Sequence, residues 1–137
     1  MTISLQACHV TVNDLDSSLA FYRDALGLEV RNDVGSGGFR WVTLGFAAQP
    51  GVEIVLSEPH AGRSQADGDA LQELLTKGVL PMIMFRTDDL DATFEKLAAF
   101  SGAEVLQEPM DQPWGPRDCA LRDPSGNMVR ISQAPKK

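Results

Sequence analysis

Cysteine is scarce in this chain of 137 residues, which holds only Cys8 and Cys119. The two residues form neither a CxxC pair nor a Cys/His spacing of the kind that binds zinc, so a zinc-ribbon framework is excluded. Two distant cysteines are also too few for a disulfide framework. Because both fall in predicted strands, we expect two small buried thiols.

Long apolar runs are absent as well. No apolar stretch approaches the ~18 residues that a membrane-spanning helix needs. The first residues, 1–6, have neither the basic flank nor the apolar core of a signal peptide. We therefore expect a cytoplasmic protein with no membrane partner.

Basic residues are outnumbered, with 12 Lys and Arg against 19 Asp and Glu, which gives a formal net charge of −7. Such a surface repels nucleic-acid phosphates, so a nucleic-acid partner is not expected, whereas a cationic ligand would be attracted. The sequence also contains no P-loop, no dinucleotide fingerprint and no nucleophile beside a base. Apolar residues make up 43% of the chain, enough for a hydrophobic core.

The most informative pattern is a repeat with an offset of 75 residues. The sequence Asp14-Leu15-Asp16 recurs as Asp89-Leu90-Asp91, and Gly27, Glu29 and Val30 recur as Gly102, Glu104 and Val105. A fixed long offset indicates two copies of one supersecondary unit, neither of which closes a core alone. The cleft between two such copies is a common place for a ligand.

Each copy is predicted to run strand, helix and three strands (βαβββ). In the first, Asn13 or Asp14 caps a helix with apolar residues at helical spacing, and Gly27 ends it. In the second, Asp88 or Asp89 caps the helix and Gly102 ends it. The predicted strands are 7–12, 28–34, 39–47 and 52–57, then 81–87, 103–107, 117–122 and 127–132.

These elements predict an α+β fold in which two tandem modules form a curved mixed sheet around a central cleft, with helices on the outer face. The first module is expected to span 1–59 and the second 80–137. The linker 60–79 would consist of a polar loop, 60–69, and a short helix, 70–77, closed by Gly78.

Strand alternation divides the predicted sheet into two faces. One face is consistently apolar and should pack on the helices: Val10, Val12, Val42, Leu44, Phe46, Val52, Ile54, Leu56, Ile83, Phe85, Val129 and Ile131. The other mixes charged, aromatic and methionine side chains, as the wall of a ligand cavity would: Ala7, His9, Thr11, Trp41, Thr43, Glu53, Val55, Met82, Met84, Met128 and Arg130.

The duplicated unit, with Asp123-Pro124-Ser125-Gly126-Asn127 near its end, resembles the vicinal oxygen chelate superfamily. That superfamily includes glyoxalase I, extradiol dioxygenases, fosfomycin-modifying enzymes and bleomycin-resistance proteins. The resemblance extends from Cys8 to Gln133. The run Gln112-Pro113-Trp114-Gly115, followed by the Asp-Pro-x-Gly-Asn turn, is most similar to the bleomycin-resistance branch.

The resemblance also implies where the superfamily's enzymes hold their divalent metal. Their two ligands per module, typically His or Gln, Glu, His and Glu, correspond here to Ala7, Val55, Met82 and Arg130. Three of these side chains offer no hard ligand atom and the fourth is a permanent cation. We therefore expect no metal and no cofactor, with a displaced site at His9 and Glu53 as the alternative.

The candidate ligand-binding residues each have a structural alternative. His9 would contact a ligand, act in acid–base chemistry or be structural, and Glu53 and Arg130 would anchor a polar ligand or pair with each other. Aromatic and methionine side chains would stack on the ligand or merely fill space. These are Trp41, Trp114, Met82 and Met84.

Three functional hypotheses follow from this resemblance and these residues. The first is a metal-independent homodimer that sequesters a planar or cationic drug or metabolite, as in bleomycin-type antibiotic resistance. The second is a lyase, isomerase or dioxygenase that uses a displaced metal or none. The third is a partner-binding module with a degenerate cavity. We favour the first, which is not an enzyme, and no catalytic residue is assigned.

Overall fold

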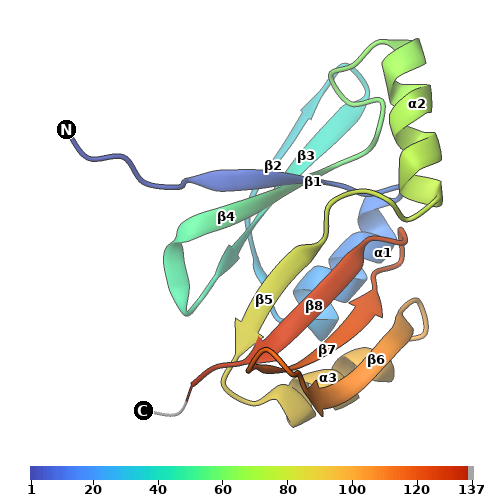
Figure 1. Ribbon diagram of the computed structural model, residues 1–137. Coiled ribbons are helices and arrows are strands. Elements are labelled where there is room, and N and C mark those ends of the chain that lie inside the picture. Colours follow the sequence, from blue (N-terminus) through green and yellow to red (C-terminus); the bar gives the residue numbers. More distant parts are fainter. Residues whose placement is uncertain (136–137) are drawn as a thin grey trace.

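The computed structural model describes residues 1–135, which form two four-stranded mixed sheets and the helices that pack against them (Figure 1). The first sheet has the strand order β1-β4-β3-β2 and the second the order β5-β8-β7-β6. In each sheet one edge strand, β1 or β5, pairs in parallel, and the other pairings are antiparallel. The strands are β1 (Ala7–Thr11), β2 (Glu29–Ser36), β3 (Phe39–Phe46), β4 (Gln49–Ser57), β5 (Ile83–Thr87), β6 (Glu104–Asp111), β7 (Arg117–Arg122) and β8 (Met128–Gln133).

The repeat predicted from the sequence is present in the fold, and the α+β arrangement of two modules is confirmed. Helix α1 (Leu15–Leu19) continues as a π-helix, η1 (Ala20–Ala25), and its counterpart in the second module is α3 (Leu90–Ala98). Asp14 caps the first helix by accepting a hydrogen bond from Ser17 N at 3.3 Å, and Asp89 caps α3 through Ala92 N at 3.1 Å. The equivalent aspartates therefore start equivalent helices.

The helix of the linker begins earlier than predicted. Helix α2 spans Gln65–Thr76, whereas the sequence pattern indicated a polar loop as far as residue 69. Ser64 starts the helix because its side chain accepts a hydrogen bond from Asp67 N at 3.1 Å. The apolar spacing was therefore a poorer guide to the start of this helix than its cap.

Strand β6 is longer than predicted and contains Pro109. This is possible because β6 is an edge strand, and the pairing register shifts between Gln107 and Met110. A proline is tolerated at such a bulge, where its missing N–H breaks no ladder hydrogen bond. The extension brings Gln107 and Met110 alongside β7.

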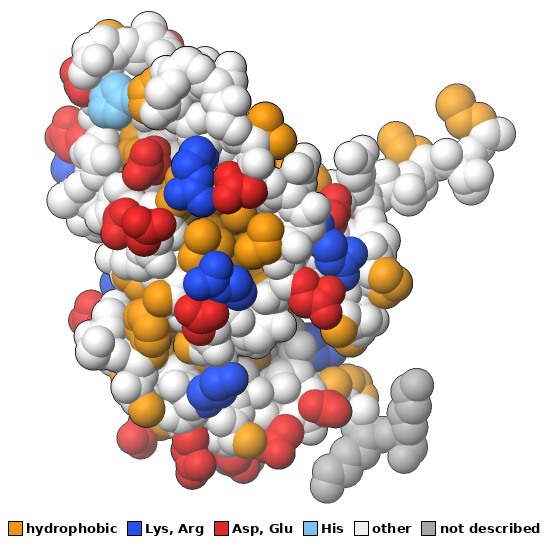
Figure 2. Space-filling model, turned by 180° about the vertical axis from the view of Figure 1, so that it is seen from behind, with side chains coloured by type: hydrophobic (Ala, Val, Ile, Leu, Met, Phe, Trp, Pro, Cys, Tyr) orange, Lys and Arg blue, Asp and Glu red, His pale blue; other side chains and the backbone are white. Residues whose placement is uncertain are grey.

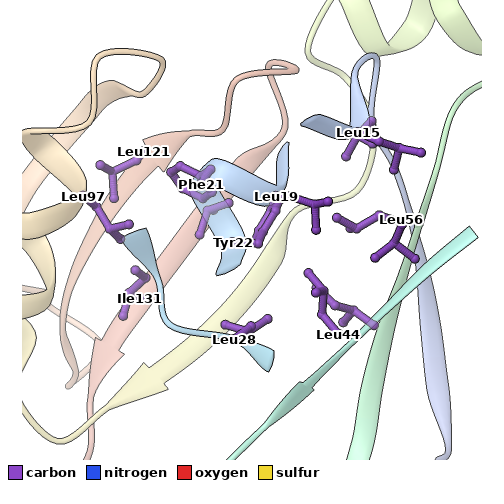
Figure 3. Packing of buried hydrophobic residues seen from close by; sticks show 14 of the residues in the cluster. Leu15, Leu19, Phe21, Tyr22, Leu28, Leu44, Leu56, Leu97, Leu121 and Ile131 are labelled. Carbon is purple, nitrogen blue, oxygen red and sulfur yellow. The ribbon is translucent and has the colours of Figure 1, made fainter. Parts of the chain in front are cut away.

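The two modules share one hydrophobic core around the first helix. Figure 3 shows Phe21 and Tyr22 lying between Leu121 and Ile131 on one side and Leu44 on the other. The Phe21 ring meets Phe100 edge-on at 5.8 Å between centroids. The apolar faces of both sheets, predicted to pack on helices, therefore meet on the same helix, and their opposite faces point away from this core.

The Asp-Pro-x-Gly-Asn turn connects the modules through buried hydrogen bonds. Tyr22 Oη donates to Asp123 Oδ2 at 2.6 Å, and Asp123 Oδ1 accepts from Ser125 N and Asn127 N, both at 2.9 Å. Asn127 Nδ2 donates to the carbonyl of Thr11 in β1 at 2.8 Å. The motif that suggested the family therefore has a structural role in this chain, because it ties the second module to the first.

Tyr22 is expected to resist ionisation until the protein unfolds. Burial, together with the negative charge and hydrogen bond of Asp123, raises the pKa of the Tyr22 phenol well above its ordinary value. Because the folded state keeps a proton that the unfolded chain releases above pH ~10, stability is lost as pH rises past that value. Tyr22 is the only tyrosine, so phenolate absorbance reports it alone. We expect that absorbance to rise together with the loss of circular dichroism, and ionisation of the still-folded protein would contradict this.

The two cysteines differ in their surroundings. Cys119 is buried as predicted, and burial raises the pKa of its thiol to about 11. The prediction for Cys8 is wrong, since this thiol is exposed. It lies on β1, whose outer edge pairs with no strand among the described residues. Within the same residues, no helix is long and apolar enough to cross a bilayer.

Candidate functional site

A pocket of about 1440 Å³ opens where the free edges of β1 and β5 face each other below α2. Its lining is predominantly apolar, with polar and charged groups set among the hydrophobic side chains, which is typical of a site for a small organic molecule. The apolar residues are Val10, Phe46, Ala48, Val52, Ile54, Leu71, Leu80, Pro81, Met82, Ile83, Met84 and Phe85. The others are Cys8, His9, Thr11, Gln49, Glu53, Arg63, Asp67, Arg86, Asn127 and Ser132.

Four of the seven candidate ligand-binding residues line this pocket, namely His9, Glu53, Met82 and Met84. His9 and Glu53 lie on neighbouring strands, because Ala7 is paired with Glu53 and His9 follows two residues later on the same face. Met84 is 70% exposed, so its thioether is available to a ligand. The pocket is also lined by six residues from the face that was predicted to pack on the helices, so alternation alone does not define its wall: Val10, Phe46, Val52, Ile54, Ile83 and Phe85.

The other three candidates, Trp41, Trp114 and Arg130, lie outside the pocket lining. The Trp41 ring borders the loop before α2, since Cζ2 is 3.6 Å from where a Cβ on Gly62 would be. Trp114 is 70% exposed at the turn between β6 and β7. Within residues 1–135, neither tryptophan is part of the pocket lining, so the structure does not place the two against one ligand.

Arg130 is paired with Asp118, not with Glu53 as one reading of the sequence had it. The guanidinium Nε lies 3.2 Å from Asp118 Oδ2, and Nη2 donates to Gln107 Oε1 at 3.1 Å. Gln107 and Gln112 also donate to Asp118 Oδ1, at 3.1 and 2.7 Å. Burial alone would raise the pKa of the Asp118 carboxyl, but these hydrogen bonds from Gln112, Arg130 and Gln107 hold it below its ordinary value. The pair is therefore a charged, oriented unit.

The sequence reasoning allowed the segment 60–79 to cover one mouth of the cleft or to cross to a partner chain, but it named no residue of this segment as a candidate. Arg63, Asp67 and Leu71 line the pocket, and so does Arg86 on β5. The signal was present, because Ser64 followed three residues later by Asp67 is a helix-start pattern, and Leu71 and Leu75 continue it at helical spacing. Recognising that pattern would have placed the first turns of α2 at the mouth of the cleft.

The residues at the superfamily's metal positions do not fit a divalent ion. Ala7, Val55 and Met82 offer no nitrogen or oxygen side-chain ligand, and the Arg130 guanidinium is already bonded to Asp118. Among the described residues, no group of three or more His, Cys, Asp or Glu side chains is placed to hold a metal. His9 and Glu53 would supply two ligands, one fewer than catalytic zinc sites usually have.

The excess of acidic residues is not gathered into one patch on the face of the molecule shown in Figure 2. Acidic and basic side chains alternate there around a small hydrophobic area. Several charges of the protein are paired on its surface, for example Arg40 with Asp33 at 2.7 Å and Arg117 with Asp91 at 2.9 Å. Net charge alone therefore says little about the ligand.

Comparison with known proteins agrees with this architecture. Residues 4–131 match the sequence model of the Glyoxalase/Bleomycin resistance protein/Dioxygenase superfamily. The chain belongs to this superfamily. Its sequence is 32% identical over 126 residues to the uncharacterized protein YurT of Bacillus subtilis strain 168, covering 90% of this chain and 94% of YurT.

Two solved structures are similar to this protein along almost the whole chain. The crystal structure of UcmS2 matches with a TM-score of 0.85 and 32% identity, covering 98% of this chain and 100% of UcmS2. TnmS3, described as an antibiotic binding protein from Streptomyces sp. CB03234, matches with a TM-score of 0.74 and 26% identity over 98% of this chain and 99% of its own. The chain is thus structurally similar to a protein that is described as binding an antibiotic.

Proposed function

We propose that this protein binds a small planar or cationic molecule, an antibiotic-like drug or a metabolite, and sequesters it in the cytoplasm without a metal. The observation that carries the proposal is the open, largely apolar pocket between β1 and β5 in a chain whose four metal-ligand positions hold Ala, Val, Met and Arg. Similarity to TnmS3 supports a ligand of the antibiotic class.

The methionines suit a ligand whose shape differs from a protein side chain. Met82 and Met84 are 49% and 70% exposed on β5, and unbranched thioether side chains adapt to irregular apolar surfaces. His9, Glu53 and Arg86 stand around them as polar contacts. We place the ligand against Met82 and Met84, with its polar groups directed toward those three side chains.

Titration calorimetry with a panel that includes bleomycin and other planar compounds tests this proposal. Met84→Asp should weaken binding about 10-fold or more, because a charge would replace an apolar contact in the pocket wall. Leu106→Asp is the matched control, since Leu106 is an exposed strand residue on β6 outside the pocket lining. Equal affinities of the wild type and Met84→Asp, or loss of binding on treatment with a chelator, would contradict metal-independent binding in this pocket.

We also propose that the protein is a homodimer whose second copy covers the outward faces of the sheets. Those faces leave large hydrophobic side chains open to water, including Val34 (47%), Met110 (46%) and Trp114 (70%). A second chain would also bring one protomer's Trp114 within reach of the other's pocket. Light scattering should give a molar mass of two chains, and the mass of a single chain would contradict this part of the proposal.

A further inference from the structure

Arg130 stands directly beside the pocket, although it is not part of its lining. It is the cross-strand partner of Met84, and Ser132 lies two residues further along the same face of β8. Both Met84 and Ser132 line the pocket. Adjacent strands are ~4.8 Å apart, so a ligand lying on the Met84 thioether is within contact distance of the Arg130 side chain.

The Arg130 guanidinium is held in one orientation by the protein. Nε donates to Asp118 Oδ2 at 3.2 Å, and Nη2 donates to Gln107 Oε1 at 3.1 Å and to Asp118 Oδ1 at 3.4 Å. Asp118 is only 5% exposed and is itself held by Gln107 and Gln112. A donor fixed in advance loses little conformational freedom when it binds a ligand.

One nitrogen of the Arg130 guanidinium, Nη1, has no hydrogen-bond partner among residues 1–135. Arginine has five N–H donors, and within residues 1–135 the two on Nη1 of Arg130 meet no acceptor. Nη1 is not buried either, because Ser18 Oγ is the one buried side-chain N or O atom without a partner in that part of the chain. Nη1 is thus a double donor that is at least partly open to solvent and is fixed in orientation by the bonds of Nε and Nη2.

We infer that Arg130 is the polar anchor of the ligand site, and that the ligand is a flat molecule with a carbonyl-type oxygen that accepts from Arg130 Nη1, not a cation. The inference rests on the proposed function and chooses between its two ligand classes. Guanidinium groups only donate, so a cation placed here would leave Nη1 unpaired. Because Asp118 neutralises the arginine, a neutral carbonyl oxygen suits the site as well as an anion does.

Three probes with one ring skeleton test the inference by calorimetry: 9-fluorenone, which has a carbonyl, fluorene, which lacks it, and 9-aminofluorene, which is cationic. The wild type should bind fluorenone about 10-fold more tightly than fluorene, as expected for a hydrogen bond to a charged donor. Arg130→Lys, which keeps a cation beside Asp118 but has no Nη1, should lose this preference while it binds fluorene unchanged.

Two further variants keep the test decisive. If Arg130→Lys does not fold, Asp118→Asn combined with Arg130→Met removes the donor without leaving a buried charge, and it should also equalise fluorenone and fluorene. Arg117→Met is the control, because Arg117 lies on β7 outside the pocket lining and pairs with Asp91, and it should keep the preference.

The outcomes separate the inference from the proposed function. Equal binding of fluorenone and fluorene by the wild type, tightest binding of 9-aminofluorene, or a preference that persists without Arg130 would overturn the inference while leaving the binding function intact. A preference lost in Arg117→Met as well would show that the loss is not specific to Arg130, and it would overturn the inference too. Failure of all three probes to bind would contradict the proposed function and, with it, the inference.

Discussion

Asp123→Ala is expected to lower the free energy of unfolding by about 3 to 5 kcal/mol, a large fraction of the stability of a domain of this size. The Asp123 side chain accepts hydrogen bonds from Tyr22 Oη, from the backbone N–H groups of Ser125 and Asn127, and from Asn127 Nδ2. Asp123 is 3% exposed, so water replaces few of these bonds after truncation. Each buried donor left without an acceptor costs about 1 to 3 kcal/mol.

Urea unfolding followed by circular dichroism measures this loss. Asp88→Ala is a suitable control, because Asp88 is also an aspartate in a loop of the second module, is exposed, and uses only its backbone carbonyl in a hydrogen bond. The free energy of unfolding of this control should lie within about 0.5 kcal/mol of that of the wild type. The free energy of unfolding of Tyr22→Phe should fall between those of Asp123→Ala and Asp88→Ala, since this substitution removes one of the hydrogen bonds to Asp123. An Asp123→Ala midpoint equal to that of Asp88→Ala would show that the turn does not stabilise the contact between modules.

The same network shows what could and could not be predicted from the sequence. The capping aspartates, the strand alternation and the stop at Gly27, which has φ +90°, depend on residues close together in the chain, and the predictions there were correct. The contact of Tyr22 with Asp123 joins residues 101 positions apart, and no local pattern encodes it. For this reason the sharing of one helix by both sheets was not foreseen.

The candidate site divides in a similar way. Alternation placed His9, Glu53 and Met84 on one face of the sheet, and all three line the pocket. Val10, Ile54 and Phe85 line it as well, although they belong to the face that was predicted to pack on the helices. The partner of Arg130 was recoverable but was overlooked. With the turn at 123–126, β7 and β8 pair in a register that sets Ala120 opposite Arg130. Asp118, two residues before Ala120, is therefore on the same face of the sheet as Arg130 and diagonal to it. The position of Trp114, in contrast, depends on a loop that has no periodic signal.

Asp118→Ala is the second substitution expected to have a large effect, lowering the free energy of unfolding by about 2 to 4 kcal/mol. It would leave the Arg130 guanidinium, whose side chain is only 21% exposed, without its carboxylate. It would also remove one acceptor from each of the amide groups of Gln107 and Gln112, which would keep only the Asp118 and Glu108 carbonyls and Gln107 Oε1. The cost arises mainly from the groups left behind, not from the attraction that is removed.

A double-mutant cycle distinguishes these contributions. If unpaired charge is the main penalty, Asp118→Ala combined with Arg130→Met should be more stable than Asp118→Ala alone, with a coupling energy of about 1 kcal/mol or more. Additive single effects in urea unfolding would show that the pair contributes nothing as a pair. Asp16→Ala is the control, because Asp16 is 89% exposed and its contact with Arg40 is long, at 3.8 Å.

The free energy of unfolding measured as a function of pH, in the acid range, gives an independent test of the Asp118–Arg130 pair. Because the hydrogen bonds to Asp118 lower its pKa in the folded state, its contribution is present above the unfolded value of ~4 and is lost as pH falls through the lower folded value. The folded chain releases a proton that the unfolded chain binds in that window, so acid favours unfolding. Asp118→Asn should therefore flatten the decline in stability below pH ~4. An unaltered acid profile in Asp118→Asn would mean that the carboxylate is not held by Gln107, Gln112 and Arg130 in solution.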